Sequence, residues 1–370
     1  MVIYFLFQVI AGAFTTSSLG VFLENRAGAA FDMVLPYFAV RILIRSRQQY
    51  LVLLKGILVI AAPLAIVGLY QCITGDNLLG FLVKYNAWTV SRGYIPTFRL
   101  GFYRATVVFS HSIMYGLFFA MFGPVCAGLL KSVKKDKTLY WIGLGLMSVG
   151  VFSSMSSGPM LGALLSVSFI ALYWCRKYWK PITLIVIVMC GTVEIISNRH
   201  FYDVLGDATL NPTTAWYRSR LIDVALFEGG MSGHWLAGFG YDVDPGWNAR
   251  IDGRGHTDMV NHYLLILSRY GLIGFVPFLM MNVMVVKRLV DAYRASIHGS
   301  DKWLVWCTSA GLFGLGGAIM SVSLFGQPTT VYYIMIGFTG VMPAIVNNRR
   351  FAIAKVPAPM GQNKPLLGFN

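Results

Sequence analysis

The sequence predicts an all-α polytopic membrane protein with about ten transmembrane helices. Of its 370 residues, 56% are hydrophobic and only 12% are charged, whereas a soluble globular chain is about one quarter charged. Apolar stretches of about 20 residues recur along the chain, and this length is needed to cross the hydrocarbon core of a bilayer. The stretches lack the period-two alternation of an outer-membrane barrel.

Short polar breaks separate the expected helices. Residues 1–23 have no basic segment ahead of their apolar run, so we expect a membrane helix there and not a cleaved signal peptide. The predicted spans are 2–23, 28–44, 51–73, 109–131, 138–154, 158–175, 181–197, 261–286, 302–324 and 328–347.

Basic residues gather in every second break. The loops near 45–50, 132–137, 176–180 and 287–301 and the tail from 348 contain RSRQQ, KSVKKDK, CRKYWK, VVKR and NNRR. Loops rich in Lys and Arg stay in the cytoplasm, so we expect this side, with both termini, to be cytoplasmic.

Two long segments, 74–108 and 198–260, then face the opposite side of the membrane. The second segment is too long for a simple connector and should contain secondary structure of its own. The chain is thus predicted to comprise helices 1–7 (1–197), a large outer loop (198–260), helices 8–10 (261–347) and a cytoplasmic tail (348–370).

The basic residues on the outer side are almost all arginines. Lys84 is the only lysine among them, and the arginines are Arg26, Arg92, Arg99, Arg104, Arg199, Arg218, Arg220, Arg250, Arg254 and Arg269. Arginine forms a rigid fork suited to phosphate and carboxylate groups. Two interpretations stay open: loop arginines paired with the acidic residues of the same side, or a phosphate-binding outer face.

Three charged residues, Asp32, Glu194 and Arg269, fall near the outer ends of predicted spans. Charge inside a membrane normally faces a cavity or a partner, so the three residues predict a polar cavity that opens outward. Asp32 and Glu194 are also shallow enough to reach the headgroups. Arg269 lies about 12 Å along its helix from Asn261, at 1.5 Å per residue, and is expected to face protein or water.

Four short motifs occur on the outer side. The stretch RLGFYRATVVFSHS places Arg104 seven residues before His111 at a helix start, and SSMSSGPMLG predicts a hairpin of small residues. WYRSRLIDVALFEGG precedes HWLAGFGYDVDPGW, which contains a Gly-x-Gly turn. GRGHTDMVNHYLLILSRYGLIGF changes from a polar loop to a helix with Gly-x-x-Gly.

The order and sidedness of these motifs, from about residue 90 to 290, resemble the O-antigen ligase and polymerase superfamily of GT-C-like bacterial envelope glycosyltransferases. The resemblance implies an enzyme of the bacterial inner membrane whose active site faces the periplasm. Such enzymes transfer undecaprenyl-pyrophosphate-linked glycan to lipid A-core (ligase) or to another lipid-linked repeat (polymerase), building O-antigen or exopolysaccharide. No cofactor, neither a nucleotide sugar nor a metal ion, is implied.

The implied partners are the lipid-linked glycan, the lipid bilayer and other polysaccharide assembly proteins, with no nucleic acid. The resemblance also implies that arginines bind the pyrophosphate, where cationic forks neutralise the leaving group. Arg104 matches the early arginine, and either Arg218 or Arg220 matches the arginine ahead of the Gly-x-Gly turn. Arg269 and His111 are further candidates for substrate contact.

The resemblance implies a histidine as general base, since an imidazole near neutral pKa accepts the proton of the acceptor hydroxyl. Asn261 matches the late helix, together with its two glycines, but the family's histidine column falls on Val260. The expected base is therefore His262 or His256, or another group such as Asp258. His262 at a helix start is equally suited to capping or to anchoring at the interface. A metal site formed by these side chains matches no standard spacing.

Two other function classes, a transporter and a structural subunit, fit the sequence less well. A transporter or flippase for a lipid-linked or anionic glycan should show repeats, broken helices and a mid-membrane site, whereas the titratable residues here gather on one face. A structural subunit has no need of an arginine-rich outer face. Within the enzyme class, the Asn-His-Tyr-Leu helix start and the arginine ahead of its glycine favour a polymerase over a ligase.

Overall fold

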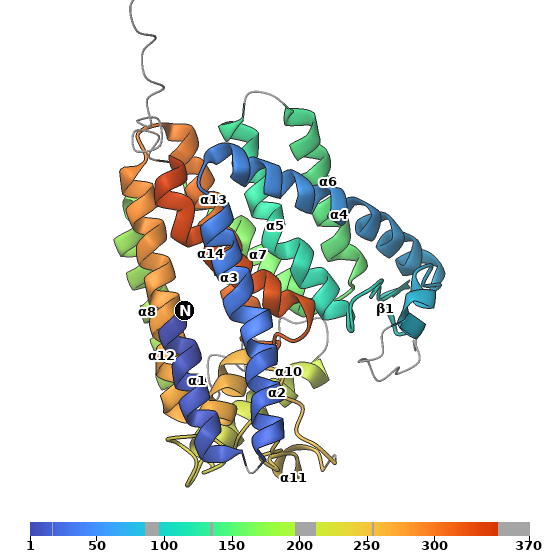
Figure 1. The fold of residues 1–370 in the computed structure, drawn as a ribbon, viewed down its shortest axis with the longest axis vertical. Coiled ribbons are helices and arrows are strands. Elements are labelled where there is room, and N and C mark those ends of the chain that lie inside the picture. Colours follow the sequence, from blue (N-terminus) through green and yellow to red (C-terminus); the bar gives the residue numbers. More distant parts are fainter. Residues whose placement is uncertain (17, 86–95, 134–135, 197–211, 254, 347–370) are drawn as a thin grey trace, which may run out of the picture.

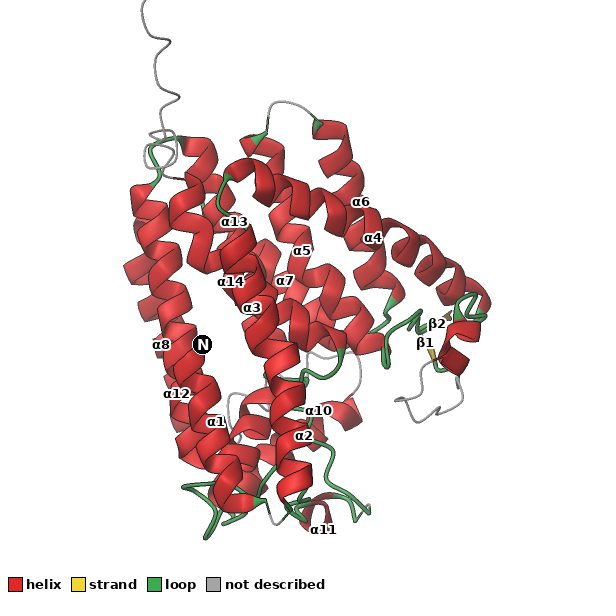
Figure 2. Ribbon diagram, in the orientation of Figure 1, coloured by secondary structure: helices red, strands yellow, loops and turns green. Residues whose placement is uncertain are grey.

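The computed structural model describes residues 1–370 except 17, 86–95, 134–135, 197–211, 254 and 347–370. Within the described residues the fold is all-α apart from one short hairpin, so the predicted fold class is confirmed at this level (Figures 1 and 2). The hairpin pairs β1 (Phe98–Arg99) with β2 (Phe102–Tyr103) in antiparallel register.

The helices follow the predicted apolar runs closely. The first half of the chain forms α1 (Val2–Thr15), α2 (Leu19–Ala29), the π-helix η1 (Ala30–Val34), α3 (Leu35–Leu43), α4 (Arg47–Thr74), the short η2 (Gly80–Tyr85), α5 (Ser112–Ser132), α6 (Lys137–Ser153) and α7 (Ser157–Ala171). The second half forms η3 (Arg176–Tyr178), α8 (Trp179–Ile196), α10 (Pro212–Ile222), the π-helix η4 (Asp223–Phe227), α11 (Asn248–Ile251), α12 (His262–Ala295), α13 (Gly299–Ala318) and α14 (Gln327–Val346).

Five helical segments in the described part of the chain are long and apolar enough to cross a membrane. They are α4, α5, the η3–α8 segment (Arg176–Ile196), α12 and α14. The apolar helices α1 and α7 are shorter. These lengths and compositions are those expected of a multi-pass membrane protein.

Helix α5 forms the centre of the bundle. Its side chains are buried on nearly every face, and it packs against α6, α7 and α13. Small residues allow close approach of the helices around it. On α13, a Cβ at Gly314 would lie 2.2 Å from the carbonyl oxygen of Gly162 on α7, so the α7–α13 contact depends on backbone-to-backbone packing.

The break between the first two helices differs from the prediction. The predicted spans place this break at 24–27, a polar stretch that contains Glu24 and Arg26. In the structure, α1 ends at Thr15 and α2 begins at Leu19. Arg26 is 7% exposed. Its guanidinium donates to the Gln8 carbonyl (3.3 Å) and to the Tyr270 hydroxyl (3.1 Å). The charge lies inside the bundle because these groups satisfy it, so it does not mark a loop.

The loops gather at two ends of the bundle (Figure 1). Helices α10 and α11 lie at the end where α1 finishes and α12 begins. The connections from α3 to α4 and from α12 to α13, the end of α5 and the start of α6 lie at the opposite end. The segment 198–260, in its described part, contains α10, η4 and α11, in agreement with the expectation that it holds structure of its own.

Candidate anion-binding site

Arg104 lies in the segment between β2 and α5 and is fixed by its backbone. Its N–H donates to the Thr97 carbonyl (2.9 Å), and the next residue, Ala105, donates to the Ser153 carbonyl (2.9 Å). The side chain reaches the turn between α6 and α7, where Nη2 donates to the Ser156 hydroxyl (2.8 Å). The Nε atom is buried without a hydrogen-bond partner. Arg104 therefore retains unused donor capacity.

A second arginine, Arg99, acts electrostatically on both Arg104 and Arg218. Arg99, on β1, donates to the Met155 carbonyl (3.4 Å) in the same α6–α7 turn. Burial and then the charge of Arg99 lower the pKa of Arg104 to about 10. Burial and the charge of Arg99 also lower the pKa of Arg218 on α10, although Asp258 raises it in part. Arg218 has a buried Nε atom without a partner.

We call Arg99, Arg104 and Arg218 the arginine cluster. In the part of the chain that the structure describes, no carboxylate forms an ion pair with any of the three. The charge of Asp258 raises the pKa of one member of the cluster, Arg218. Cations that repel one another without a paired carboxylate are suited to an anionic ligand, which would relieve both the repulsion and the unmet donors.

The frame of the cluster contains strained backbone. Val107 (φ 53°) and Met155 (φ 42°) adopt left-handed conformations, which are unfavourable for any residue other than glycine and particularly for a β-branched one. Gln71 of α4 is fully buried and accepts from the N–H groups of Thr106 (3.0 Å) and Val107 (2.9 Å). Strain held in place by surrounding hydrogen bonds is common at functional sites.

His111 caps the N-terminus of α5 beside the cluster. Its Nδ1 accepts from the Ile113 N–H (3.1 Å), so the proton of the neutral ring lies on Nε2. Burial and then the charge of Arg104 lower the pKa of His111 to about 4. At neutral pH the ring is therefore uncharged, and its free Nε2–H is a hydrogen-bond donor suited to an anionic oxygen.

The half-buried cap makes the stability of the fold depend on pH. Between pH 6.5 and about 4 the unfolded chain binds a proton at His111 and the folded chain does not, so stability should fall as the pH falls through this window. Asn caps a helix in the same way and does not titrate. We expect His111→Asn to lose less thermal stability than the wild type between pH 7 and pH 5, measured as the melting temperature in detergent. An equal loss in both proteins would contradict the assigned cap.

The other two arginine candidates lie elsewhere. Both terminal nitrogens of Arg220 bind the carboxylate of Glu228, one of them at 3.0 Å, and this ion pair raises the pKa of Arg220. Arg269 lies over the ring of Tyr241, with 4.2 Å between the guanidinium carbon and the ring centroid. Arg104 and Arg218 thus both interact with the charge of Arg99, while Arg220 and Arg269 have other partners.

The start of α12 has a structural explanation. The side-chain oxygen of Asn261 accepts from the N–H groups of Tyr263 (3.0 Å) and Leu264 (3.1 Å), which caps the helix. His262 is 5% exposed. Its Nδ1 accepts from the Leu324 N–H (3.3 Å), so in the neutral ring the other nitrogen carries the proton. Neither nitrogen is then free to accept a proton from a substrate.

The remaining acid–base candidates lie in the loop before α12. His256 is exposed. Although burial raises the pKa of Asp244, hydrogen bonds from Gly246 and Thr257 and the charge of His256 lower it. Asp258 is exposed, and its backbone N–H donates to the Tyr217 hydroxyl (2.9 Å). Among the described residues no three His, Cys, Asp or Glu side chains are grouped so that they could hold a metal ion.

The two glycine motifs interlock. Gly271 breaks α12 with φ 56° and ψ −160°, and the freed N–H groups of Leu272 and Ile273 donate to the carbonyls of Trp235 (2.8 Å) and Leu236 (3.1 Å). The Gly-x-Gly turn returns this contact, since the Phe239 N–H donates to the Ser268 carbonyl (2.7 Å). This contact fixes the loop between η4 and α11 on α12.

Arg99 belongs to the arginine cluster, but the sequence motifs did not predict it as a site residue. It is one of the ten arginines that the sequence predicts on the outer side. The stretch Arg99–Leu–Gly–Phe–Tyr–Arg104 carries the signal, because a two-residue turn at Leu100 and Gly101 lets the two ends of this stretch approach one another.

Comparison with known proteins identifies no relative: no family model matches the chain, and neither a curated protein nor a solved structure is detectably similar to it.

Proposed function

We propose that this protein is a membrane glycosyltransferase that transfers undecaprenyl-pyrophosphate-linked glycan, with polymerisation of repeats favoured over ligation to lipid A-core. The arginine cluster is the observation that carries the proposal. Three guanidinium groups that form no ion pair with a carboxylate of the described residues fit a ligand of high negative charge, and a pyrophosphate presents several oxygens to such forks.

The proposal includes a topology of ten spans, with α2, η1 and α3 together forming the second. The basic ends near 45–50, 132–137 and 287–301 then face the cytoplasm, and the cluster faces the periplasm of a bacterial inner membrane. Lipid-linked donors have their pyrophosphate at the membrane surface. The proposed site meets this requirement, since Arg104 lies in the segment that leads into α5 and His111 caps that helix.

Within this proposal the residues have distinct roles. The oxygen of an acceptor hydroxyl attacks the anomeric carbon of the donor glycan, and the bond from that carbon to the pyrophosphate oxygen breaks. The leaving pyrophosphate keeps the electron pair, and Arg99, Arg104 and Arg218 stabilise its charge. Asp258, whose charge raises the pKa of Arg218, accepts the proton of the hydroxyl. His262 is unsuited to this step because its ring is enclosed.

Asp258→Asn tests the assignment of the base. The amide cannot accept the proton, so turnover should fall by about 100-fold or more, while binding of the donor changes little. His256→Gln is the matched variant, two residues away in the same loop, and should keep most of the activity. If His256→Gln abolished turnover and Asp258→Asn did not, the base would be His256.

The enzyme assay itself tests the function. The purified chain is reconstituted into liposomes with undecaprenyl-pyrophosphate-linked repeats, and glycan length and released undecaprenyl pyrophosphate are measured. We expect longer glycans and one released carrier lipid for each linkage. Carrier lipid that keeps its glycan under all conditions would contradict the proposal.

A transporter for a lipid-linked or anionic glycan is the second candidate, and one observation favours it. Arg26 is buried between α1, α2 and α12 with an unpartnered Nε atom, and a buried cation inside a membrane is typical of a substrate path. The same liposomes distinguish the two functions. A transporter would make the labelled glycan accessible on the opposite face without lengthening it.

A further inference from the structure

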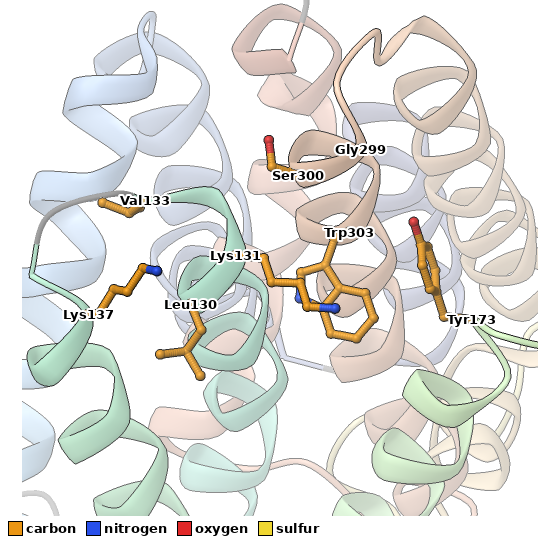
Figure 3. A pocket seen from close by; sticks show the side chains of 8 residues that line it. All are labelled: Leu130, Lys131, Val133, Lys137, Tyr173, Gly299, Ser300 and Trp303. Atoms are coloured by element: carbon orange, nitrogen blue, oxygen red, sulfur yellow. The ribbon is translucent and has the colours of Figure 1, made fainter.

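A second basic site lies at the other end of the bundle from the arginine cluster. A cavity of about 540 Å³ opens between the end of α5, the start of α6 and the start of α13 (Figure 3). Its volume falls within the range of roughly 300–1,000 Å³ that is typical of small-ligand sites. It is lined by Leu130, Lys131, Val133, Lys137, Tyr173, Gly299, Ser300 and Trp303.

The lining carries positive charge and no carboxylate. Lys131 and Lys137 both line the cavity. The two neighbouring acids are already compensated, because Asp301 pairs with Arg47 (2.9 Å) and Asp136 pairs with Lys55. In the described residues neither lining lysine has a carboxylate partner. The cavity is therefore suited to an anion.

Aromatic side chains hold one of these lysines in place. The Lys131 ammonium lies 4.1 Å from the centroid of the Trp303 ring and 5.7 Å from that of Trp174. The Trp303 indole is itself fixed, since its N–H donates to the Ala127 carbonyl (3.0 Å) and its ring contacts Tyr173 edge-on at 5.0 Å. A cation held by a cation–π contact keeps its charge and is positioned before a ligand arrives.

The two sides of the cavity differ in polarity. Leu130 and Val133 form an apolar edge, whereas Gly299 and Ser300 begin α13 and bring the start of that helix to the opposite edge. The N-terminal end of a helix favours negative charge. A ligand with an anionic head and an apolar body matches this arrangement better than a small soluble anion does.

We propose that this cavity binds the phosphate headgroup of an anionic membrane lipid, such as phosphatidylglycerol, from the leaflet at this end of the bundle. Lysines and aromatic residues together are typical of the membrane interface, and basic pockets between membrane helices on the cytoplasmic side hold lipid headgroups. The headgroup lies between Lys131 and Lys137, and the acyl chains leave along Leu130. This binding does not depend on glycan transfer.

Lipid binding to the full-length protein tests the proposal. The protein in a neutral detergent is titrated with phosphatidylglycerol, or with phosphatidylcholine of the same chain length, and bound lipid is counted by native mass spectrometry. We expect phosphatidylglycerol to be retained in preference. Lys131→Gln/Lys137→Gln should weaken its binding by at least about tenfold, given roughly 1 kcal/mol for each basic residue near a lipid surface. Lys137→Gln alone removes one of the two lining charges and should weaken it in part.

Two controls give the proposal a definite outcome. Lys177→Gln/Lys287→Gln removes two exposed lysines outside the cavity and should leave lipid binding unchanged. Equal losses in both double variants would overturn the proposal, because attraction to general surface charge would then explain them. Inorganic phosphate is the second probe. If millimolar phosphate displaced the lipid completely, the cavity would be a site for soluble anions and the lipid assignment would be wrong.

Discussion

Arg104→Gln is expected to lower glycan transfer in liposomes by about 100-fold or more, since removing one preorganised donor to a developing anion costs 10²–10³ in turnover. Arg104 is anchored to the α6–α7 turn through Ser156 and lies in the segment that leads into α5. Glutamine keeps a hydrogen bond to that hydroxyl but loses the charge. The release of undecaprenyl pyrophosphate per unit time measures the effect.

Arg220→Gln is the matched control for that variant. Its guanidinium is committed to Glu228, so its loss removes an exposed ion pair, which is worth about 0–1 kcal/mol. Transfer should remain near the wild-type rate. An Arg220→Gln protein as inactive as Arg104→Gln would mean that the pairing with Glu228 opens on substrate binding and that the cluster has been assigned wrongly.

Gly271→Ala should prevent the loop between η4 and α11 from docking on α12. A Cβ at this position would lie 2.3 Å from the Leu236 carbonyl oxygen, and the backbone conformation (φ 56°) is itself unfavourable for alanine. The obstacle is backbone, which cannot rotate away, so we expect a loss of at least about 3 kcal/mol of stability. The yield of monodisperse protein and the melting temperature in detergent measure this loss.

Gly145→Ala provides the control for the glycine. Nothing lies within 4 Å of a Cβ at this position on α6, and alanine is the better helix former. We expect unchanged or slightly raised stability. If Gly271→Ala behaved in the same way, the break in α12 and its contact with the Gly-x-Gly turn would be wrong.

Hydropathy was sufficient to place most helices, because crossing a membrane requires long apolar runs whatever their partners are. It failed at the first break, where Arg26 read as a loop residue. Its partners, the Gln8 carbonyl and the Tyr270 hydroxyl, lie 18 and 244 residues away in sequence. A pattern confined to a short window cannot show such a contact, so the true break between Thr15 and Leu19 was missed.

The candidate site shows the same limit. Arg218 and Arg220 are two residues apart, so they point about 200° apart around a helix, and sequence spacing does not say which one faces the cluster. The structure separates them through the pairing of Arg220 with Glu228. His262 is a titratable residue at a helix start, and this position predicted a catalytic role. Its burial and its hydrogen bond from the Leu324 N–H depend on the segment between α13 and α14, which is distant in sequence.

The proposed pyrophosphate site is tested most directly by the affinity of the protein for undecaprenyl pyrophosphate without its glycan. Binding is measured in nanodiscs of phosphatidylcholine for the wild type, for Arg99→Gln/Arg104→Gln/Arg218→Gln and for Arg220→Gln. We expect the triple variant to lose at least about 100-fold in affinity and Arg220→Gln to bind like the wild type. Equal affinity in all three proteins would contradict the claim that this cluster is the pyrophosphate site.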